Sequence, residues 1–163
     1  MPINQNINVY LLKQRRVIFI IIGVFLLLVI NLVITSIPFL ASIDSVSPKK
    51  KLIESGVITA FITVIIIAPI IETILFQYLP ITIISFFLKE NKYIKPITII
   101  ISAISFSVVH IYNYTYFIMA FIGGLIFAYL FILSKQRKEN PVVNLLVIHT
   151  LLNLIPFTRD FII

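Results

Sequence analysis

The sequence contains no cysteine, and only six of its 163 residues are acidic. Without cysteine the chain can form neither a disulfide nor a thiolate metal site, and a cysteine nucleophile is excluded. Charged residues make up 12% of the chain, whereas 60% of it is hydrophobic and the mean hydropathy is +1.12. A single soluble core cannot bury so much apolar surface, and the composition predicts an all-α, polytopic bundle of about five to six transmembrane helices.

The formal net charge of +7 raises the question of a nucleic-acid partner. The basic residues stand in short clusters at the edges of apolar runs, without interleaved stacking aromatics, so we predict no nucleic-acid binding. Such clusters are typical of topology signals. The first apolar run, residues 17–41, is too long for the core of a signal peptide and no small-residue cleavage site follows it, which favours an uncleaved first helix.

We divide the chain into a cytoplasmic N-terminal tail (1–16), a first transmembrane helix (17–41), a membrane core (56–157) and a C-terminal tail (158–163). The run at 56–88 exceeds the roughly 20 residues that one crossing requires, and Pro69 and Pro80 are predicted to interrupt it. With five crossings, nine Lys and Arg fall on the side of the N-terminus and four on the other. The positive-inside rule then predicts a cytoplasmic N-terminus, although three lysines at 49–51 oppose it and a re-entrant 56–88 segment would move the C-terminus.

Only three ionisable side chains lie within the apolar runs: Glu72, His110 and His149. An ionised group in a transmembrane helix costs about 2.5 to 3.5 kcal/mol on insertion scales, so such residues usually face a bundle interior or a wet cavity. We therefore predict that these three side chains meet inside the membrane. A lone histidine can also simply hydrogen-bond to a neighbouring helix, but a carboxylate in this position normally marks a site.

Spacing adds further polar residues to this set. Three pairs are four residues apart and therefore share a helix face: Phe106 with His110, His149 with Asn153, and Thr73 with Gln77. The combined group could support either of two chemistries. A carboxylate and an imidazole could activate a water, or Glu72, His110 and His149 could coordinate a divalent metal such as zinc.

These motifs resemble those of the CAAX prenyl protease and bacteriocin-processing family (CPBP, or Abi) of intramembrane proteases. The family's first motif, Glu-Glu-x-x-x-Arg, usually lies within a run like Ala-Pro-Ile-x-Glu-Glu-x-x-Phe-Arg-Gly, which residues 68–77 follow closely, with Glu72 as the first glutamate. Phe-x-x-x-His is matched from Phe106 to His110, and His-x-x-x-Asn from His149 to Asn153. The resemblance covers about residues 56–157.

The resemblance implies that Glu72 and His110 activate the attacking water, while His149 and Asn153 stabilise the oxyanion. It also implies a bacterial plasma-membrane protein that acts on a membrane-associated peptide or protein in the lipid bilayer. No cofactor is expected, and a zinc ion is the minority alternative.

Two positions depart from the family pattern, since the second glutamate is Thr73 and the arginine is Gln77. Losing both charges together avoids leaving one of them buried and unpaired, and we predict that the two neutral groups hydrogen-bond to each other. The sequence therefore predicts an intramembrane endopeptidase, with a bacteriocin self-immunity or accessory protein of reduced or no proteolysis as the alternative. A transport role has no support from repeated halves.

One geometric difficulty accompanies the predicted site. Counted from the proposed cytoplasmic ends at the helical rise of about 1.5 Å per residue, His149 lies about 12 Å deep and His110 about 21 Å. The two side chains can meet only if a helix is tilted or broken.

Overall fold

The computed structural model describes residues 3–37, 54–88 and 94–161. These residues are helical and include no strand, which confirms the predicted all-α membrane bundle. Within them, the segments long and apolar enough to cross a membrane are α2 (Arg16–Thr35), Val57–Phe87, α9 (Tyr114–Gln136) and most of α10 (Pro141–Phe161). A shorter apolar helix, α8 (Ile94–Val108), joins them, and α1 (Ile3–Lys13) precedes α2. The residues that we assigned to a C-terminal tail continue α10 as far as Phe161.

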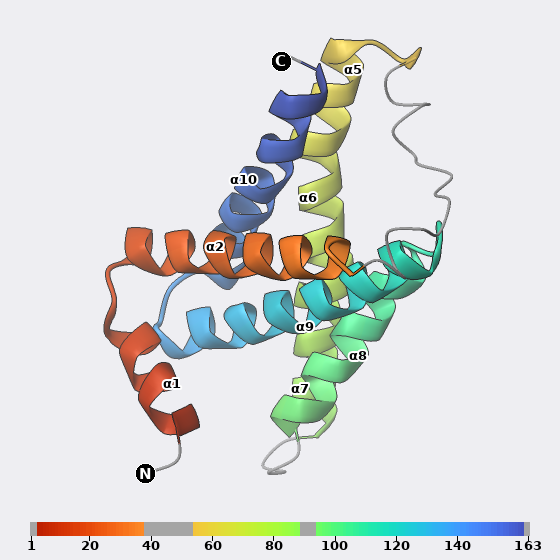
Figure 1. Ribbon diagram of the computed structural model, residues 1–163. Coiled ribbons are helices and arrows are strands. Elements are labelled where there is room, and N and C mark those ends of the chain that lie inside the picture. Colours follow the sequence, from red (N-terminus) through yellow and green to blue (C-terminus); the bar gives the residue numbers. More distant parts are fainter. Residues whose placement is uncertain (1–2, 38–53, 89–93, 162–163) are drawn as a thin grey trace.

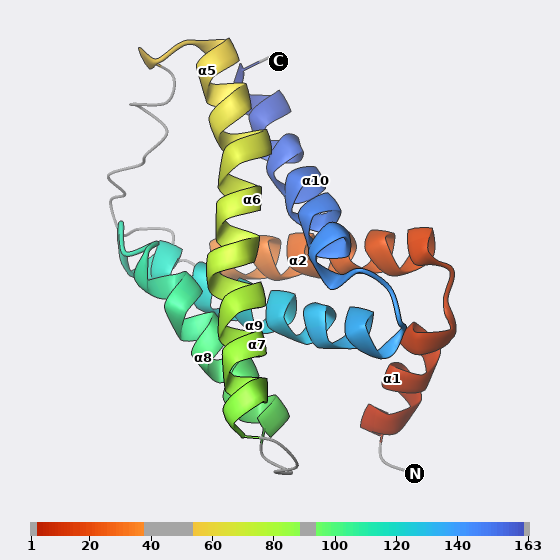
Figure 2. The same ribbon diagram turned by 180° about the vertical axis from the view of Figure 1, so that it is seen from behind.

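Helix α9 occupies the middle of the bundle, in contact with α2, α8 and α10. Figures 1 and 2 show α2 lying along α9, while α10 and the long helix cross this pair at a steep angle. Two glycines permit close packing. A Cβ on Gly23 of α2 would lie 2.9 Å from Ile148 Cδ1 of α10, and one on Gly124 of α9 would lie 2.9 Å from the Cα of Ala103 in α8.

The long helix at Val57–Phe87 is continuous, so the prediction that its prolines interrupt it is wrong. It consists of alternating α and π segments: α5 (Val57–Phe61), η1 (Ile62–Ile67), α6 (Ala68–Glu72), η2 (Thr73–Tyr78) and α7 (Leu79–Phe87). A proline has no N–H to donate, and each one leaves a carbonyl of the preceding turn without its donor. In lipid such a carbonyl must be satisfied from within the protein.

Side chains of α10 donate to the two carbonyls that lie within reach of the missing N–H of Pro69. Depending on whether the turn is α or π, the missing N–H of Pro69 would have reached the carbonyl of Ile65 or of Val64. Thr150 Oγ1 donates to the Ile65 oxygen over 3.2 Å, and Asn153 Nδ2 donates to the Val64 oxygen over 3.0 Å. One of these hydrogen bonds therefore replaces the donor that the proline lacks, and both join α10 to the long helix.

Pro80 has a similar partner in α8. The carbonyl of Phe76, four residues earlier, accepts a hydrogen bond from Ser102 Oγ of α8 over 2.5 Å. The long helix is thus held to α10 on one side of Glu72 and to α8 on the other. This bracing keeps the middle of the helix in a defined position despite the two prolines.

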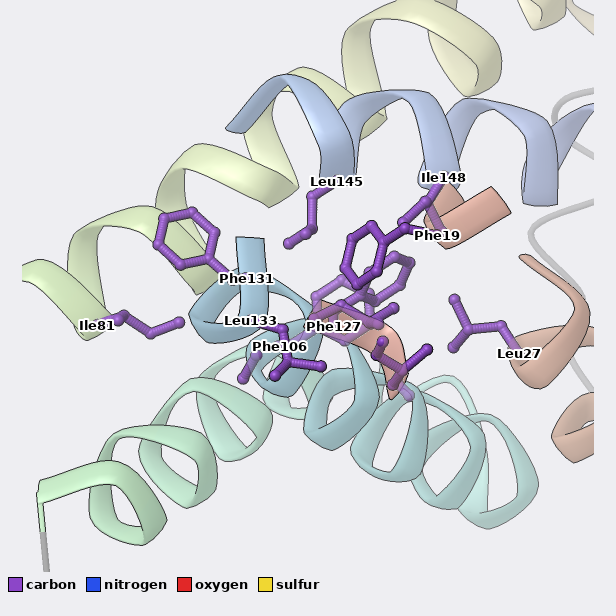
Figure 3. Close-up of a cluster of buried hydrophobic side chains, with 13 residues drawn as sticks. Phe19, Leu27, Ile81, Phe106, Phe127, Phe131, Leu133, Leu145 and Ile148 are labelled. Atoms are coloured by element: carbon purple, nitrogen blue, oxygen red, sulfur yellow. The ribbon is translucent and has the colours of Figure 1, made fainter. Parts of the chain in front are cut away.

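The core lies where α2, α8, α9 and α10 meet. Figure 3 shows its largest side chains, among them Phe19 and Leu27 from α2, Phe127 from α9 and Ile148 from α10. Phe106 of α8 belongs to the same cluster, although its ring also borders the polar residues described below. The core therefore extends directly to the candidate site.

A polar network closes the end of the bundle where α1 meets the α9–α10 connection. The Arg137 guanidinium donates to the Leu11 carbonyl of α1 and to Glu139 Oε1, the latter over 2.7 Å. Asn144 donates to the other Glu139 oxygen over 2.7 Å and accepts from Arg16 of α2. The hydrogen bond from Arg137 holds the pKa of the Glu139 carboxyl below its ordinary value. The network ties α1 and α2 to the rest of the bundle.

Candidate active site

Glu72 lies at the middle of the long helix, fifteen residues from Val57 and fifteen from Phe87. It is the last residue of α6, between the π segments η1 and η2. Short π-helical segments within an α-helix are rare, and they are found frequently at functional sites. The position places the carboxylate roughly 20 Å from either end of the helix, near the middle of the hydrocarbon layer.

His110 does not lie in a helix but in the turn that follows α8. Sixteen residues separate Glu72 from Leu88, and sixteen separate Ile94 from His110, on the two arms of one helical hairpin. Because equal lengths of helix run from the hairpin connection, both residues lie at a similar depth. Because α8 is short, it ends beside Glu72, at the depth of the middle of the long helix.

The structure brings Glu72, His110 and His149 together. His110 Nε2 is 3.8 Å from Glu72 Oε1, and His149 Nε2 is 3.4 Å from Glu72 Oε2. The oblique course of α10 in Figure 1 removes the depth difference that a straight bundle would have imposed. Each carboxylate oxygen therefore faces one imidazole.

A backbone contact determines the tautomer of His110. Its Nδ1 is 2.7 Å from the Phe106 carbonyl oxygen, which can only accept a hydrogen bond. Nδ1 therefore carries a proton, and in the neutral ring Nε2 presents its lone pair toward Glu72. This contact gives the spacing of Phe-x-x-x-His a geometric basis, because the residue four positions before His110 supplies the backbone carbonyl that orients its ring.

Two phenylalanines position the imidazole rings. The Phe106 ring lies 4.5 Å from the His110 ring and 6.2 Å from the His149 ring, between centroids. Phe127 of α9 lies 4.8 Å from the His149 ring. Figure 3 shows Phe106 and Phe127 side by side in the core. Sequence reasoning did not identify Phe127, although it lies four residues after Gly123 and thus on the same face of α9.

A cavity of about 470 Å³ opens beside these groups. Glu72, His110, His149 and Asn153 all line it. The rest of its wall includes residues of α2 (Leu27, Ile30, Asn31), of α9, of the long helix (Val64, Ala68) and of α10 (Leu152, Pro156, Arg159), together with four further aromatic residues (Tyr112, Tyr116, Phe157, Phe161). The volume lies within the range of ordinary small-ligand pockets. The lining combines polar side chains with a larger number of apolar ones.

Asn153 has a structural contact as well as a place in the cavity. One hydrogen of its Nδ2 is used by the Val64 carbonyl. A side-chain amide has two such hydrogens and an acceptor oxygen, so one donor and one acceptor remain. Because Asn153 is one helical turn from His149 on α10, both residues present polar atoms to the same part of the cavity.

Thr73 and Gln77 lie behind the site and do not line the cavity. Both are about 1% exposed on η2, which packs against α8, α9 and α10. The predicted hydrogen bond between them is absent in the described part of the chain, where Gln77 Nε2 has no partner. The two departures from the family pattern therefore replace groups beneath Glu72, not groups that face the cavity.

The residues described in the structure include no group of three or more His, Cys, Asp or Glu side chains arranged to hold a metal ion. Glu72, His110 and His149 remain the nearest approach to a ligand set.

A family model described as Rce1-like, type II CAAX prenyl endopeptidase, matches residues 54–155. Comparison with curated proteins gave no match, and neither did comparison with solved structures. The matched region contains Glu72, His110, His149 and Asn153, and excludes α1 and α2. Since it spans well over half of the chain, the protein belongs to the Rce1-like family of CAAX endopeptidases, which confirms the resemblance to the CPBP intramembrane proteases.

Proposed function

We propose that this protein is an intramembrane endopeptidase that hydrolyses a peptide bond of a membrane-associated peptide or protein, using a water activated by Glu72 and His110. The observation that carries the proposal is the pair of contacts from one carboxylate to two imidazoles, 3.8 Å and 3.4 Å, on the wall of a 470 Å³ cavity. Family membership supports peptide hydrolysis in the membrane.

The 3.8 Å separation between Glu72 Oε1 and His110 Nε2 is slightly shorter than a shared water requires, so a small opening of the pair would admit one. Both atoms are acceptors, and a water that donates one proton to each places its two acceptors about 4 to 4.5 Å apart at ordinary hydrogen-bond lengths. Its oxygen lone pairs then point into the cavity. The water oxygen attacks the carbonyl carbon of the scissile bond as the carboxylate takes its proton.

The remaining groups complete the hydrolysis. His149 and the free Nδ2 hydrogen of Asn153 donate to the oxygen that becomes negative in the tetrahedral intermediate. The intermediate collapses with cleavage of the C–N bond, and the proton held by Glu72 passes to the leaving nitrogen. The products are a carboxylic acid and an amine, which exchange a proton and leave as a carboxylate and an ammonium group, while Glu72 is again ionised. No step uses Thr73 or Gln77.

The test uses the purified protein in lipid vesicles with two internally quenched peptides, one farnesylated at a CAAX cysteine and one an unlipidated apolar peptide. Glu72→Gln and His110→Gln keep the size of each side chain but remove the base, so cleavage should fall by about 100-fold or more. Thermal unfolding controls for folding. Normal cleavage by folded Glu72→Gln protein would refute the mechanism.

A metal chelator distinguishes the alternative chemistry. Our proposal predicts that prolonged treatment with dipicolinate leaves cleavage unchanged. Loss of activity that zinc restores would instead assign Glu72, His110 and His149 to a metal ion.

Asn153 and Thr150 provide a matched pair, because each donates from α10 to a neighbouring carbonyl of the long helix, Val64 and Ile65 respectively. Replacing either residue with alanine should remove one hydrogen bond between helices, worth about 1 kcal/mol. Only Asn153→Ala should also slow cleavage, by about 100-fold if it contributes an oxyanion donor. Equal losses of rate in the two variants would reduce Asn153 to a packing residue.

A second candidate is a self-immunity or accessory protein with little or no proteolysis. It is favoured by the neutral, buried Thr73 and Gln77, which stand where the family pattern has an acid and an arginine. Protection of cells that survives Glu72→Gln would support this function, whereas protection that requires Glu72 would support proteolysis.

We further propose a cytoplasmic N-terminus. In Figures 1 and 2 the N-terminal helix and the end of α7 lie toward one end of the molecule, and α5 and the C-terminus toward the other. Lys13 lies in the last turn of the N-terminal helix, and Arg137 of the α9–α10 connection donates to the Leu11 carbonyl of the same helix. Since basic residues are retained preferentially on the cytoplasmic side, this end of the molecule is assigned to the cytoplasm.

A further inference from the structure

The first transmembrane helix supplies part of the wall of the active-site cavity. Leu27, Ile30 and Asn31 of α2 line the same space as Glu72, although α2 lies outside the residues matched by the family model. Helix α2 is packed tightly against the bundle, because Leu27 is 3% exposed and Gly23 brings the helix into close contact with Ile148 of α10. The contribution of α2 to the cavity is therefore a property of this chain's own packing.

Asn31 is the only polar side chain between Val17 and Val33. A side-chain amide in an apolar environment is unfavourable unless its donors and acceptor are satisfied. Within residues 3–37, 54–88 and 94–161, no hydrogen bond joins the Asn31 side chain to another residue, and only its backbone carbonyl accepts one, from Thr35. Asn31 lines the cavity, and within the described residues its side-chain amide is not used by another group.

The cavity also has space for a ligand beside the neighbouring helix. A Cβ placed on Gly123 of α9, which lines the cavity, would meet no heavy atom within 4 Å. A peptide that enters an apolar cavity brings N–H and C=O groups that lose their water. A side-chain amide can satisfy one of each, as a neighbouring strand would.

We propose that Asn31 is a substrate-positioning residue whose side-chain amide hydrogen-bonds the backbone of the bound peptide and holds the scissile carbonyl beside Glu72. This inference depends on the proposed peptidase function for its kinetic test but not for its binding test. It extends the substrate site to a helix outside the family core.

The kinetic test compares Asn31→Leu with Asn31→Gln and Leu32→Ala, using the farnesylated quenched peptide in vesicles. Leu32 is 68% exposed on the neighbouring face of α2 and serves as the control. Loss of one neutral hydrogen bond should raise KM about two- to twelvefold with little change in kcat. Asn31→Gln should retain most of the affinity. Asn31→Leu makes α2 more apolar, and we expect the variant to fold normally. If Asn31 had a purely structural role, this variant would instead have a lower unfolding temperature.

The binding test uses a dansylated form of the same peptide and protein that carries Glu72→Gln. Adding Asn31→Leu to this background should weaken binding by the same factor. If wild-type protein fails to cleave but binding depends on Asn31, the inference stands and the peptidase function fails. If cleavage depends on Glu72 but neither KM nor peptide binding changes in the Asn31 variants, the inference is overturned and the function stands.

The absence of cysteine permits a third readout that needs no cleavage. Asn31→Cys should react with a water-soluble maleimide, and the bound peptide should slow the reaction, because the side chain faces the cavity. Leu32→Cys, on the lipid-facing side, should react slowly with or without peptide. Equal labelling of the two positions, or no protection of residue 31, would contradict the proposal.

Discussion

Adjacent glycines on α9 offer a sensitive test of the packing. A Cβ on Gly124 would lie 2.9 Å from the Cα of Ala103 and 3.3 Å from both its Cβ and its carbonyl oxygen. These atoms belong to the backbone of α8 or are attached directly to it, so α8 itself must move by several tenths of an ångström. A Cβ on Gly123 would meet nothing within 4 Å. The same substitution should therefore have opposite effects at neighbouring positions.

The magnitudes follow from two contributions. Glycine to alanine in a helix stabilises by about 0.5 to 1 kcal/mol through reduced backbone entropy, and both variants gain this. Overpacking a tight contact costs about 1 to 3 kcal/mol, and only Gly124→Ala incurs it. Gly123→Ala should thus be slightly more stable than the wild type. Gly124→Ala should be less stable than Gly123→Ala by about 1 to 3 kcal/mol.

The assay is equilibrium unfolding in mixed micelles, paired with cleavage of the quenched peptide. Because α8 leads into the turn that carries His110, a displaced α8 should also separate His110 from Glu72 and lower kcat in Gly124→Ala. Gly123→Ala should keep a normal kcat. Equal stability of the two variants, or greater stability of Gly124→Ala, would show that the α8–α9 contact is not as close as the structure has it.

Three other predictions concern the same bundle. Gly123→Leu should fill part of the cavity and raise KM at least severalfold without lowering the unfolding temperature. Ser102→Ala removes the donor to the Phe76 carbonyl and should destabilise the protein by about 1 kcal/mol in the same unfolding assay. Because Arg137 lowers the pKa of Glu139, the stability contributed by this carboxylate is fully present above its ordinary value of 4.5 and is lost as the pH falls through the lowered value. Glu139→Gln should therefore flatten the fall in unfolding temperature below pH 4.5, whereas an unchanged acid profile would argue against this network.

The sequence by itself determined the class of protein and nominated the site. An ionised group in lipid is expensive, so the few residues that could be ionised within apolar runs had to be grouped or functional. Glu72, His110 and His149 were nominated on this ground, and motif spacing added Asn153. Both arguments are local or compositional, which is why they needed no knowledge of how the helices cross. The catalytic roles of these residues remain proposals that the variants above test.

Only the tertiary structure decided how the prolines, glycines and secondary polar groups act. Pro69 and Pro80 look like helix breakers in sequence, but the carbonyls near them are satisfied by Thr150, Asn153 and Ser102, between 26 and 89 residues away along the chain. No periodicity encodes such a pairing. It depends on which helices become neighbours.

The same reasoning applies to residues that look equivalent in sequence. Gly123 and Gly124 are adjacent, yet one faces an open cavity and the other the backbone of α8. Asn31 had no identifiable partner in the sequence, and the structure places it on the wall of the cavity with Glu72. A side chain's type limits which contacts are favourable, whereas the crossing of helices distant in sequence determines which contacts form.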